Sequence, residues 1–133
     1  MTTNSKDLRS NCPINFALET FGDKWTLLVI RDLMFKKKRH YSDFLTSDEK
    51  ISTNILADRL QKLEARGVIS KLADPESASK YIYSLTEKGQ ALLPAMIELT
   101  AWSAQYDSLT NTPTEFLDTY KINKDALIEK FKA

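Results

Sequence analysis

The stretch ISTNILADRLQKLEARGVIS (residues 51–70) predicts a helix, the end of that helix and the start of a strand. Ser52 is a favourable N-cap, because its hydroxyl can accept a hydrogen bond from a free N–H group of the first turn. At 3.6 residues per turn, Leu56, Leu60 and Leu63 lie on one side of the helix. Gly67 marks its end, because glycine readily adopts the left-handed conformation that follows many helices. The β-branched residues after it indicate a strand.

The side of this helix opposite to the leucines carries short polar side chains. Asn54, Ala57, Asp58 and Gln61 fall on this side, and Ser52 and Thr53 stand at the start of the helix. A helix that reads DNA packs one face on its own domain and offers a short polar face and its N-terminus to the major groove. The structural alternative is that Ser52 only caps an ordinary amphipathic helix, which many folds contain. Asp58 is unfavourable near phosphates unless its carboxylate accepts from a cytosine amino group.

Helical patterns precede this stretch. Pro13 suits the first position of a helix that Gly22 ends, with Cys12 at the cap. Asp23 can cap the next helix, which is apolar on most sides and therefore buried. A short third helix is expected over residues 41–46, before a polar connector.

A hairpin pattern and further helices follow. Two strand-like runs, residues 68–72 and 80–85, flank a loop of Asp, Pro, Ser and Ala, which is typical of a hairpin. Thr86 caps a long helix in which Pro94 either bends the helix or marks its true start. Residues 114–133 suit one or two short amphipathic helices.

This order of elements predicts a mainly α fold with a small β-hairpin, namely a winged helix-turn-helix with flanking dimerisation helices. We expect a single domain over residues 1–133. Residues 12–89 form the winged helix-turn-helix core with its N-terminal helices, and residues 90–133 form a dimerisation helix and a C-terminal tail. The charge is consistent with this division, because residues 1–89 hold 15 Lys and Arg against 12 Asp and Glu, and residues 90–133 hold 4 against 6.

The composition excludes several classes of protein. With 42% apolar residues, three glycines and four prolines, the 133-residue chain can build a core rather than stay disordered. It has no apolar run near the ~20 residues that span a bilayer and no secretory signal, which favours a soluble cytoplasmic protein with no membrane partner. One cysteine and one histidine argue against a disulfide framework, a zinc site and nucleophile–base catalysis. We therefore expect no metal, no cofactor and no enzymatic activity.

The basic residues suggest where a nucleic acid would bind. Four consecutive basic residues, 36–39, precede the short third helix and could clamp a phosphate; the alternative is a solvated turn that keeps the domain soluble. Lys71 and Lys80 flank the hairpin loop and can approach phosphates or a minor groove. The predicted DNA-binding residues are Lys36, Lys37, Lys38, Arg39, Ser42, Ser52, Thr53, Asn54, Asp58, Gln61, Lys62, Lys71 and Lys80.

Four blocks together resemble a known family. They are CPINFALETFGDKWTLLVIRDL, HYSDFL, ISTNILADRLQKLEARGVISK and YSLTEKGQALLPAM, within residues 12–102. On these motifs the chain resembles HxlR-type transcriptional regulators, which are winged-helix proteins related to the MarR group. Two departures stand out: the segment before the third helix is lysine-rich where relatives commonly have a glycine turn, and the tail over residues 108–133 is longer than the family core requires.

The resemblance implies a homodimer that binds a two-fold site on double-stranded DNA and responds to reactive electrophiles, oxidants or small metabolites. It implies that the N-terminal and long C-terminal helices join the two copies. The apolar stripe on the long helix fits this role, although it could instead pack on the chain's own core. The predicted dimerisation residues are Ile14, Leu92, Met96, Leu99, Trp102 and Tyr106.

Cys12 has two interpretations. Some members of the family use a lone N-terminal cysteine before this proline as a redox sensor, and a helix N-terminus favours the reactive thiolate. The alternative is a small residue that packs at the dimer interface. The function predicted overall is a sequence-specific DNA-binding regulator. The rival is a winged-helix protein-interaction module without DNA binding, which the net charge of +1 and Asp58 favour.

Overall fold

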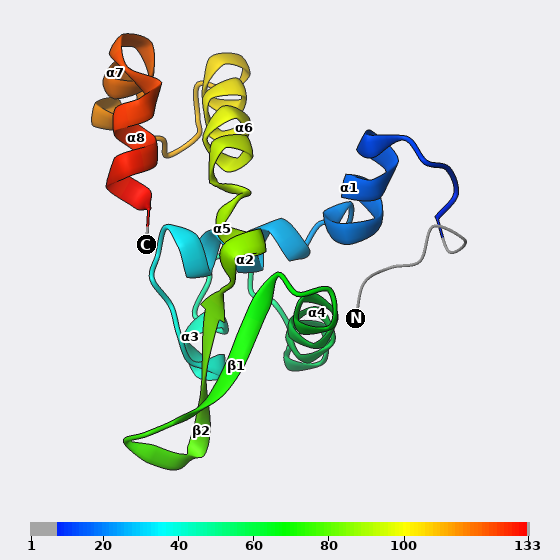
Figure 1. Cartoon of the computed structure of the whole chain (residues 1–133). Coiled ribbons are helices and arrows are strands. Elements are labelled where there is room, and N and C mark those ends of the chain that lie inside the picture. The colour runs from blue at the N-terminus through cyan, green and yellow to red at the C-terminus, as the bar shows by residue number, and fades with distance from the viewer. Residues whose placement is uncertain (1–7, 133) are drawn as a thin grey trace. The chain divides into compact units, whose positions relative to one another are not determined.

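The computed structural model describes residues 8–132, which form two compact units divided between Gly89 and Gln90 (Figure 1). The first unit is a winged helix-turn-helix, as the sequence predicted. Its elements are α1 (Pro13–Phe21), α2 (Thr26–Met34), α3 (Tyr41–Phe44), α4 (Thr53–Ala65), β1 (Ile69–Asp74) and β2 (Ser77–Leu85). A short helix, α5, leads to the three helices of the second unit. These four are α5 (Glu87–Gln90), α6 (Leu93–Tyr106), α7 (Thr114–Ile122) and α8 (Lys124–Phe131).

The core of the first unit lies between α2, α3, α4 and the base of the hairpin. Leu56, Leu60 and Leu63 of α4 are at most 3% exposed, which confirms the face predicted to point inward. From the hairpin, the Tyr83 ring packs edge-on against Phe44 of α3, with 6.2 Å between ring centroids. Because α4 is held on this side, its polar side is left outside.

The helix boundaries follow from capping interactions that the sequence indicated. Asp23 Oδ1 accepts hydrogen bonds from the N–H groups of Trp25 (2.7 Å) and Thr26 (2.9 Å) at the start of α2. Ser52 Oγ accepts from the N–H of Ile55 at the start of α4 (3.2 Å). Gly67 has φ +75°, so it occupies the left-handed region expected after that helix.

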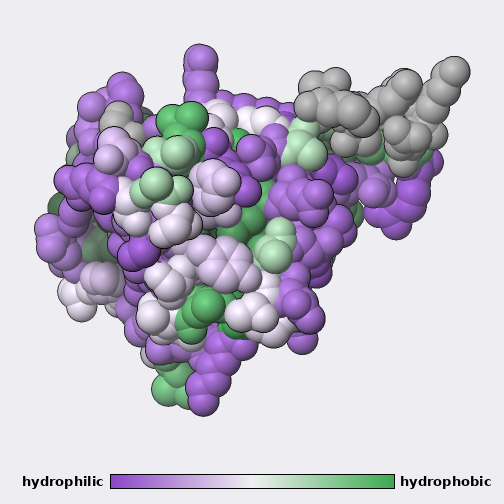
Figure 2. Space-filling view, turned by 90° about the horizontal axis from the view of Figure 1, so that it is seen from below, coloured by the Kyte–Doolittle hydropathy of each residue, from purple (hydrophilic) through white to green (hydrophobic). Residues whose placement is uncertain are grey.

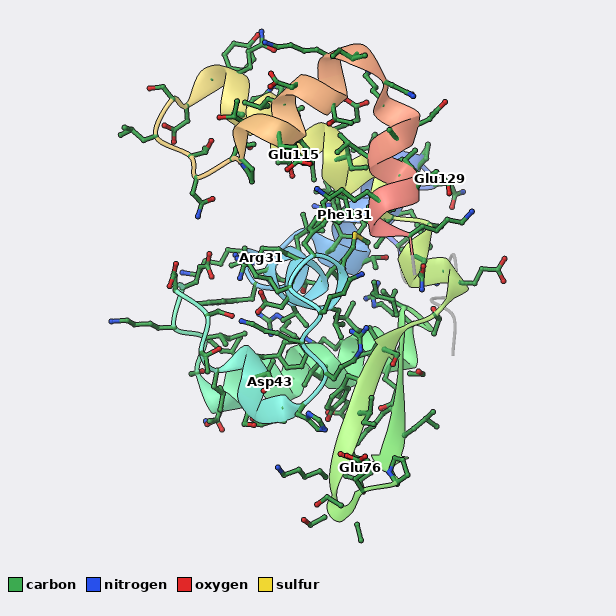
Figure 3. The ribbon with its side chains drawn as sticks, turned by 90° about the vertical axis from the view of Figure 1, so that its left-hand side faces the viewer. Arg31, Asp43, Glu76, Glu115, Glu129 and Phe131 are labelled. Atoms are coloured by element: carbon green, nitrogen blue, oxygen red, sulfur yellow. The ribbon has the colours of Figure 1, made fainter. Side chains whose placement is uncertain are left out.

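The hairpin, called the wing below, consists of β1, β2 and the residues between them, and it extends beyond the helices of its unit (Figure 1). It is longer than predicted, because the expected loop between residues 72 and 80 shrinks to Pro75 and Glu76. The strands continue into the residues that suggested a loop: Ala73 pairs with Tyr81 and Asp74 with Ser77, and the register is irregular between these two pairs. Strand pairing thus overrides their weak intrinsic preference. Figure 3 labels Glu76 at the tip of the wing.

Lys37 adopts φ +55°, in the left-handed region that glycine populates most readily. It lies in the connector between α2 and α3, so this lysine-rich segment makes a left-handed turn without a glycine. The connector also pairs with the wing, because the N–H of Tyr83 donates to the Arg39 carbonyl oxygen at 2.8 Å.

The second unit is built on α6. Pro94 lies in the first turn of this helix and therefore marks its start, which is one of the two roles predicted for it. The predicted Thr86 cap serves the short α5, since Thr86 Oγ1 accepts from the N–H of Gly89 at 3.2 Å. Within residues 8–132, no helix is both long and apolar enough to cross a bilayer.

The C-terminal residues form two helices, and α8 packs against α6. Leu127 of α8 is 1% exposed. Glu98 of α6 accepts hydrogen bonds from the Tyr120 hydroxyl (2.5 Å) and from Lys124 Nζ (3.1 Å). The tail that exceeds the family core is thus a folded helix pair anchored on α6.

Candidate nucleic-acid interface

The polar face of α4 is exposed from its first turn onward. Asn54 and Gln61, on the side opposite to the buried leucines, are exposed, as are Ser52 and Thr53 at the start of the helix. Figure 2 looks at the molecule from below and shows hydrophilic residues around a middle region of intermediate and hydrophobic ones. A capped helix N-terminus beside short amide and hydroxyl side chains offers both donors and acceptors to a base edge.

The short helix α3 is fixed to the start of α4. The Tyr41 hydroxyl donates to the Thr53 carbonyl oxygen at 2.7 Å. Asp43, labelled on α3 in Figure 3, accepts at 3.1 Å from the N–H of His40 through its Oδ2 atom. This bond holds the pKa of Asp43 below its usual value. Ser42 is exposed on α3, so the predicted contact residue is accessible. Sequence reasoning missed the Tyr41 contact, because a tyrosine on an apolar face looks like a core residue.

The basic run divides into two exposed and two engaged residues. Lys36 and Lys37 are exposed. Lys38 turns inward, with its Nζ 2.9 Å from Ser47 Oγ and 3.3 Å from a carboxylate oxygen of Asp32. Arg39 donates to main-chain carbonyl oxygens from its Nη1 atom. Of the four residues predicted to clamp a phosphate, Lys36 and Lys37 are thus the exposed ones.

Asp32 organises the turn behind this run. Its side chain is 4% exposed, and it also accepts from the Ser47 hydroxyl (2.5 Å) and from Arg31 Nε (3.0 Å). Arg31 extends the network by a bidentate pair with Glu49, at 2.7 and 2.9 Å. These hydrogen bonds lower the pKa of Glu49 to about 2. The stabilisation from this pair is therefore present above the ordinary value of 4.5 and is lost as the pH falls toward 2.

The wing presents two lysines and is fastened to the connector by the single histidine. Lys71 and Lys80 are exposed, and Lys71 Nζ lies 4.2 Å from the centroid of the Tyr81 ring. His40 Nε2 lies 2.9 Å from Asp74 Oδ2, near the end of β1. This contact places the wing beside α3, and the spacing of 34 residues gave no sign of it in the sequence.

Charged residues on α4 form a chain that begins at the cap of α2. Arg59 Nε lies 3.2 Å from Asp23 Oδ1, and Arg59 Nη1 donates to Asp58 Oδ2. Lys62 Nζ lies 3.2 Å from the same oxygen. Burial alone would raise the pKa of Asp23, but hydrogen bonds from Thr26 and the main chain, with Arg59, lower it to about 2. The predicted contact residues Asp58 and Lys62 are thus partners of each other.

The predicted dimerisation residues differ in accessibility. Ile14 is 69% exposed, Leu99 46%, Trp102 64% and Tyr106 70%. The ring centroids of Trp102 and Tyr106 lie 5.5 Å apart. Leu92 is half-buried, and Met96 is only 8% exposed within the single chain. Large apolar side chains left in water favour an interface, whereas Met96 contributes to the chain's own packing.

Cys12 is exposed at the N-cap of α1. Arg9, three residues before Cys12, is bound to Glu19 (3.0 Å) and to Asn15 (2.8 Å), and Lys24 Nζ lies 5.5 Å from the Trp25 ring centroid. No cluster of His, Cys, Asp and Glu that could hold a metal ion occurs among residues 8–132.

The family model for the HxlR-like helix-turn-helix matches residues 20–111. The chain belongs to the HxlR family. YodB of Bacillus subtilis (strain 168), an HTH-type transcriptional regulator, is 36% identical over 96 residues, which cover 71% of this chain and 85% of YodB. An HTH-type transcriptional regulator of Synechocystis, sll1512, is 35% identical over 66% of this chain and 64% of its own.

Solved structures of HxlR-like and MarR-family regulators share the fold. PA1607, a putative transcription factor, has a TM-score of 0.70 at 32% identity, covering 84% of this chain and 75% of its own. Reduced YodB has a TM-score of 0.60 at 31% identity, covering 75% and 98%. The redox regulator HypR in its oxidised form has a TM-score of 0.61 at 28% identity, covering 71% and 96%. The HxlR model starts at residue 20 and ends at residue 111, so Cys12, α7 and α8 lie outside the matched residues.

Proposed function

We propose that this protein is a homodimeric transcriptional regulator that binds specific sequences in double-stranded DNA. The observation that carries the proposal is the exposed polar face of α4, which is held by three buried leucines and by the Tyr41 contact at its start. Lys36 and Lys37 of the connector and Lys71 and Lys80 of the wing would contact phosphates. Membership of a family of HTH-type regulators supports this function over a protein-interaction module.

Replacing Asn54 and Gln61 by alanine is expected to weaken binding to a selected duplex by at least about tenfold per residue, because each loses hydrogen bonds to a base edge. The duplex would come from selection with a random library, and binding would be followed by fluorescence anisotropy. Asn111→Ala, an exposed change in the loop after α6, is the matched control and should bind as the wild type does.

The same titration distinguishes DNA binding from its rival. Wild-type affinity should fall steeply with salt, by roughly 10³ or more between 50 and 200 mM if six or more phosphates are contacted. The double change Lys36→Ala and Lys37→Ala should reduce the salt slope by about 0.9 for each phosphate that the lysines no longer neutralise. A wild type that selects no duplex and shows no salt-dependent binding would support the interaction module instead.

We also propose that the dimer responds to electrophiles or oxidants through Cys12. YodB has been solved in a quinone-bound form and a diamide-treated form, and HypR in reduced and oxidised forms. In this chain the supporting observation is the exposure of the Cys12 thiol at a helix N-terminus. Oxidation or alkylation there would add bulk or charge to α1, whose apolar side chains are exposed.

The Cys12→Ser protein is expected to keep its DNA affinity and to lose its response to a quinone or hypochlorite, because serine has no thiol to modify. Anisotropy titrations with and without the reagent measure this for the wild type and the variant. Met96→Leu is a matched control for oxidation elsewhere. A response of equal size in Cys12→Ser would contradict the role of the thiol.

A further inference from the structure

Asp58 is the acidic residue on the polar face of α4, and two cationic side chains contact one oxygen of its carboxylate. Arg59 Nη1 and Lys62 Nζ both contact Oδ2. The side chain is 43% exposed. The hydrogen bond from Lys62 lowers the pKa of Asp58, so the group is an ionised acceptor at neutral pH. Both cations contact Oδ2, so Oδ1 is the oxygen left to accept from an outside donor.

Arg59 is itself held by a contact with Asp23, before the start of α2. Its side chain is 21% exposed, and Nε is shielded from solvent at 3.2 Å from Asp23 Oδ1. The contact is an ion pair rather than an aligned hydrogen bond, since Nε has no hydrogen-bond partner within the described residues. Asp23 in turn is held by the first turn of α2. The chain from Asp23 through Arg59 therefore sets the position of the Asp58 carboxylate.

The same contacts remove the main objection to an acid on a DNA-binding surface. A lone carboxylate would repel the phosphates on both sides of the groove. Here Lys62 and Arg59 neutralise Asp58, and Arg59 is shared with Asp23, so the four groups together carry no net charge. Asp58 also lies one turn beyond Asn54 and three residues before Gln61, on the same ridge of the helix.

We propose that Asp58 reads a cytosine in each half-site and that Arg59 is its positioning residue. This inference rests on the proposed function. The major-groove edge of cytosine presents the N4 amino group as a donor, and an ionised carboxylate can only accept. Adenine also offers an amino group, but its neighbouring N7 atom is an acceptor that repels the second carboxylate oxygen. Guanine and thymine present acceptors at the corresponding place, so both are disfavoured.

The test is a selection of duplexes from a random library by the full-length protein, followed by sequencing. The wild type should enrich a two-fold motif with cytosine at one position of each half-site. Asp58→Asn keeps the shape of the side chain but adds a donor, so the preference for cytosine over the other bases at that position should fall about fivefold or more. Arg59→Gln should weaken the preference at the same position and leave the rest of the motif unchanged.

Lys62→Ala is the matched control, because it removes the other charged partner of Asp58 without removing the Asp23–Arg59 anchor. It should lower affinity and salt dependence while the cytosine preference is kept. If the wild type enriches a motif that Asp58→Asn reproduces without change, the reading role of Asp58 is overturned and the proposed function stands. If the wild type enriches no motif, the proposed function fails and this inference fails with it.

Discussion

Replacing Asp32 by alanine is expected to lower the free energy of unfolding by about 3 kcal/mol, near the low end of the cost of breaking a buried ion pair. The Asp32 side chain is 4% exposed, and its removal leaves Lys38, only 17% exposed, without its carboxylate partner. The Ser47 hydroxyl also loses its acceptor. Arg31 keeps its bidentate pair with Glu49, which limits the loss. Chemical denaturation followed by circular dichroism measures the effect.

Asp48→Ala is the matched control for this change. Asp48 is an exposed acid in the connector between α3 and α4, next to Ser47. The control should alter the free energy of unfolding by no more than about 0.5 kcal/mol. The free energy of unfolding of Asp32→Asn should lie between those of Asp32→Ala and Asp48→Ala. The amide oxygen can still accept from Ser47, while the charge opposite Lys38 is lost. Equal stability of Asp32→Ala and Asp48→Ala would show that the buried network contributes nothing to folding.

The network around Asp32 also shows where sequence reasoning stops. The pattern of α2 indicated a helix buried on most sides, and Asp32 sits within it beside one partner from the same helix, Arg31. Its partners Lys38 and Ser47 come from the connectors on either side of α3. Their approach depends on the tertiary path of the chain, including the left-handed turn at Lys37. The basic run therefore looked like one exposed cluster.

Local features were predicted well because their causes are local. The buried leucines of α4, the Ser52 and Asp23 caps and the turn at Gly67 depend on residues within a few positions of each other. The length of the wing was not predicted, because the residues near its tip have weak strand preferences and are held by cross-strand pairing.

For the candidate interface, the sequence indicated which side chains line α4 but not how they are held. The contacts of Arg59 with Asp23 and of Tyr41 with Thr53 join residues 36 and 12 positions apart. Neither contact belongs to a helical or strand periodicity. Met96 illustrates the converse limit: helical spacing placed it on the dimer stripe, yet it is buried within one chain. Periodicity assigns a face to a residue, while packing decides what covers it.

Replacing Trp102 by glutamate is expected to convert the proposed dimer to a monomer and to weaken binding to a two-fold DNA site by at least about 100-fold. Trp102 is 64% exposed in the single chain, where its ring contacts that of Tyr106. Its replacement should therefore cost the fold of the single chain little. A glutamate placed in an apolar interface would have to be desolvated without a partner. The loss of dimerisation also removes the gain from binding two half-sites at once.

Light scattering coupled to size-exclusion chromatography measures the mass of each variant, and anisotropy on the selected duplex measures its affinity. Leu99→Glu, on the same exposed stripe of α6, should behave as Trp102→Glu does. Asn111→Glu adds the same charge to an exposed loop of the same unit and should remain dimeric. The far-ultraviolet circular dichroism spectrum should be the same for the three variants, because each keeps its helices. A Trp102→Glu protein that keeps both the dimer mass and the wild-type affinity would place the interface elsewhere, because a buried charge at its centre is not tolerated at so small a cost.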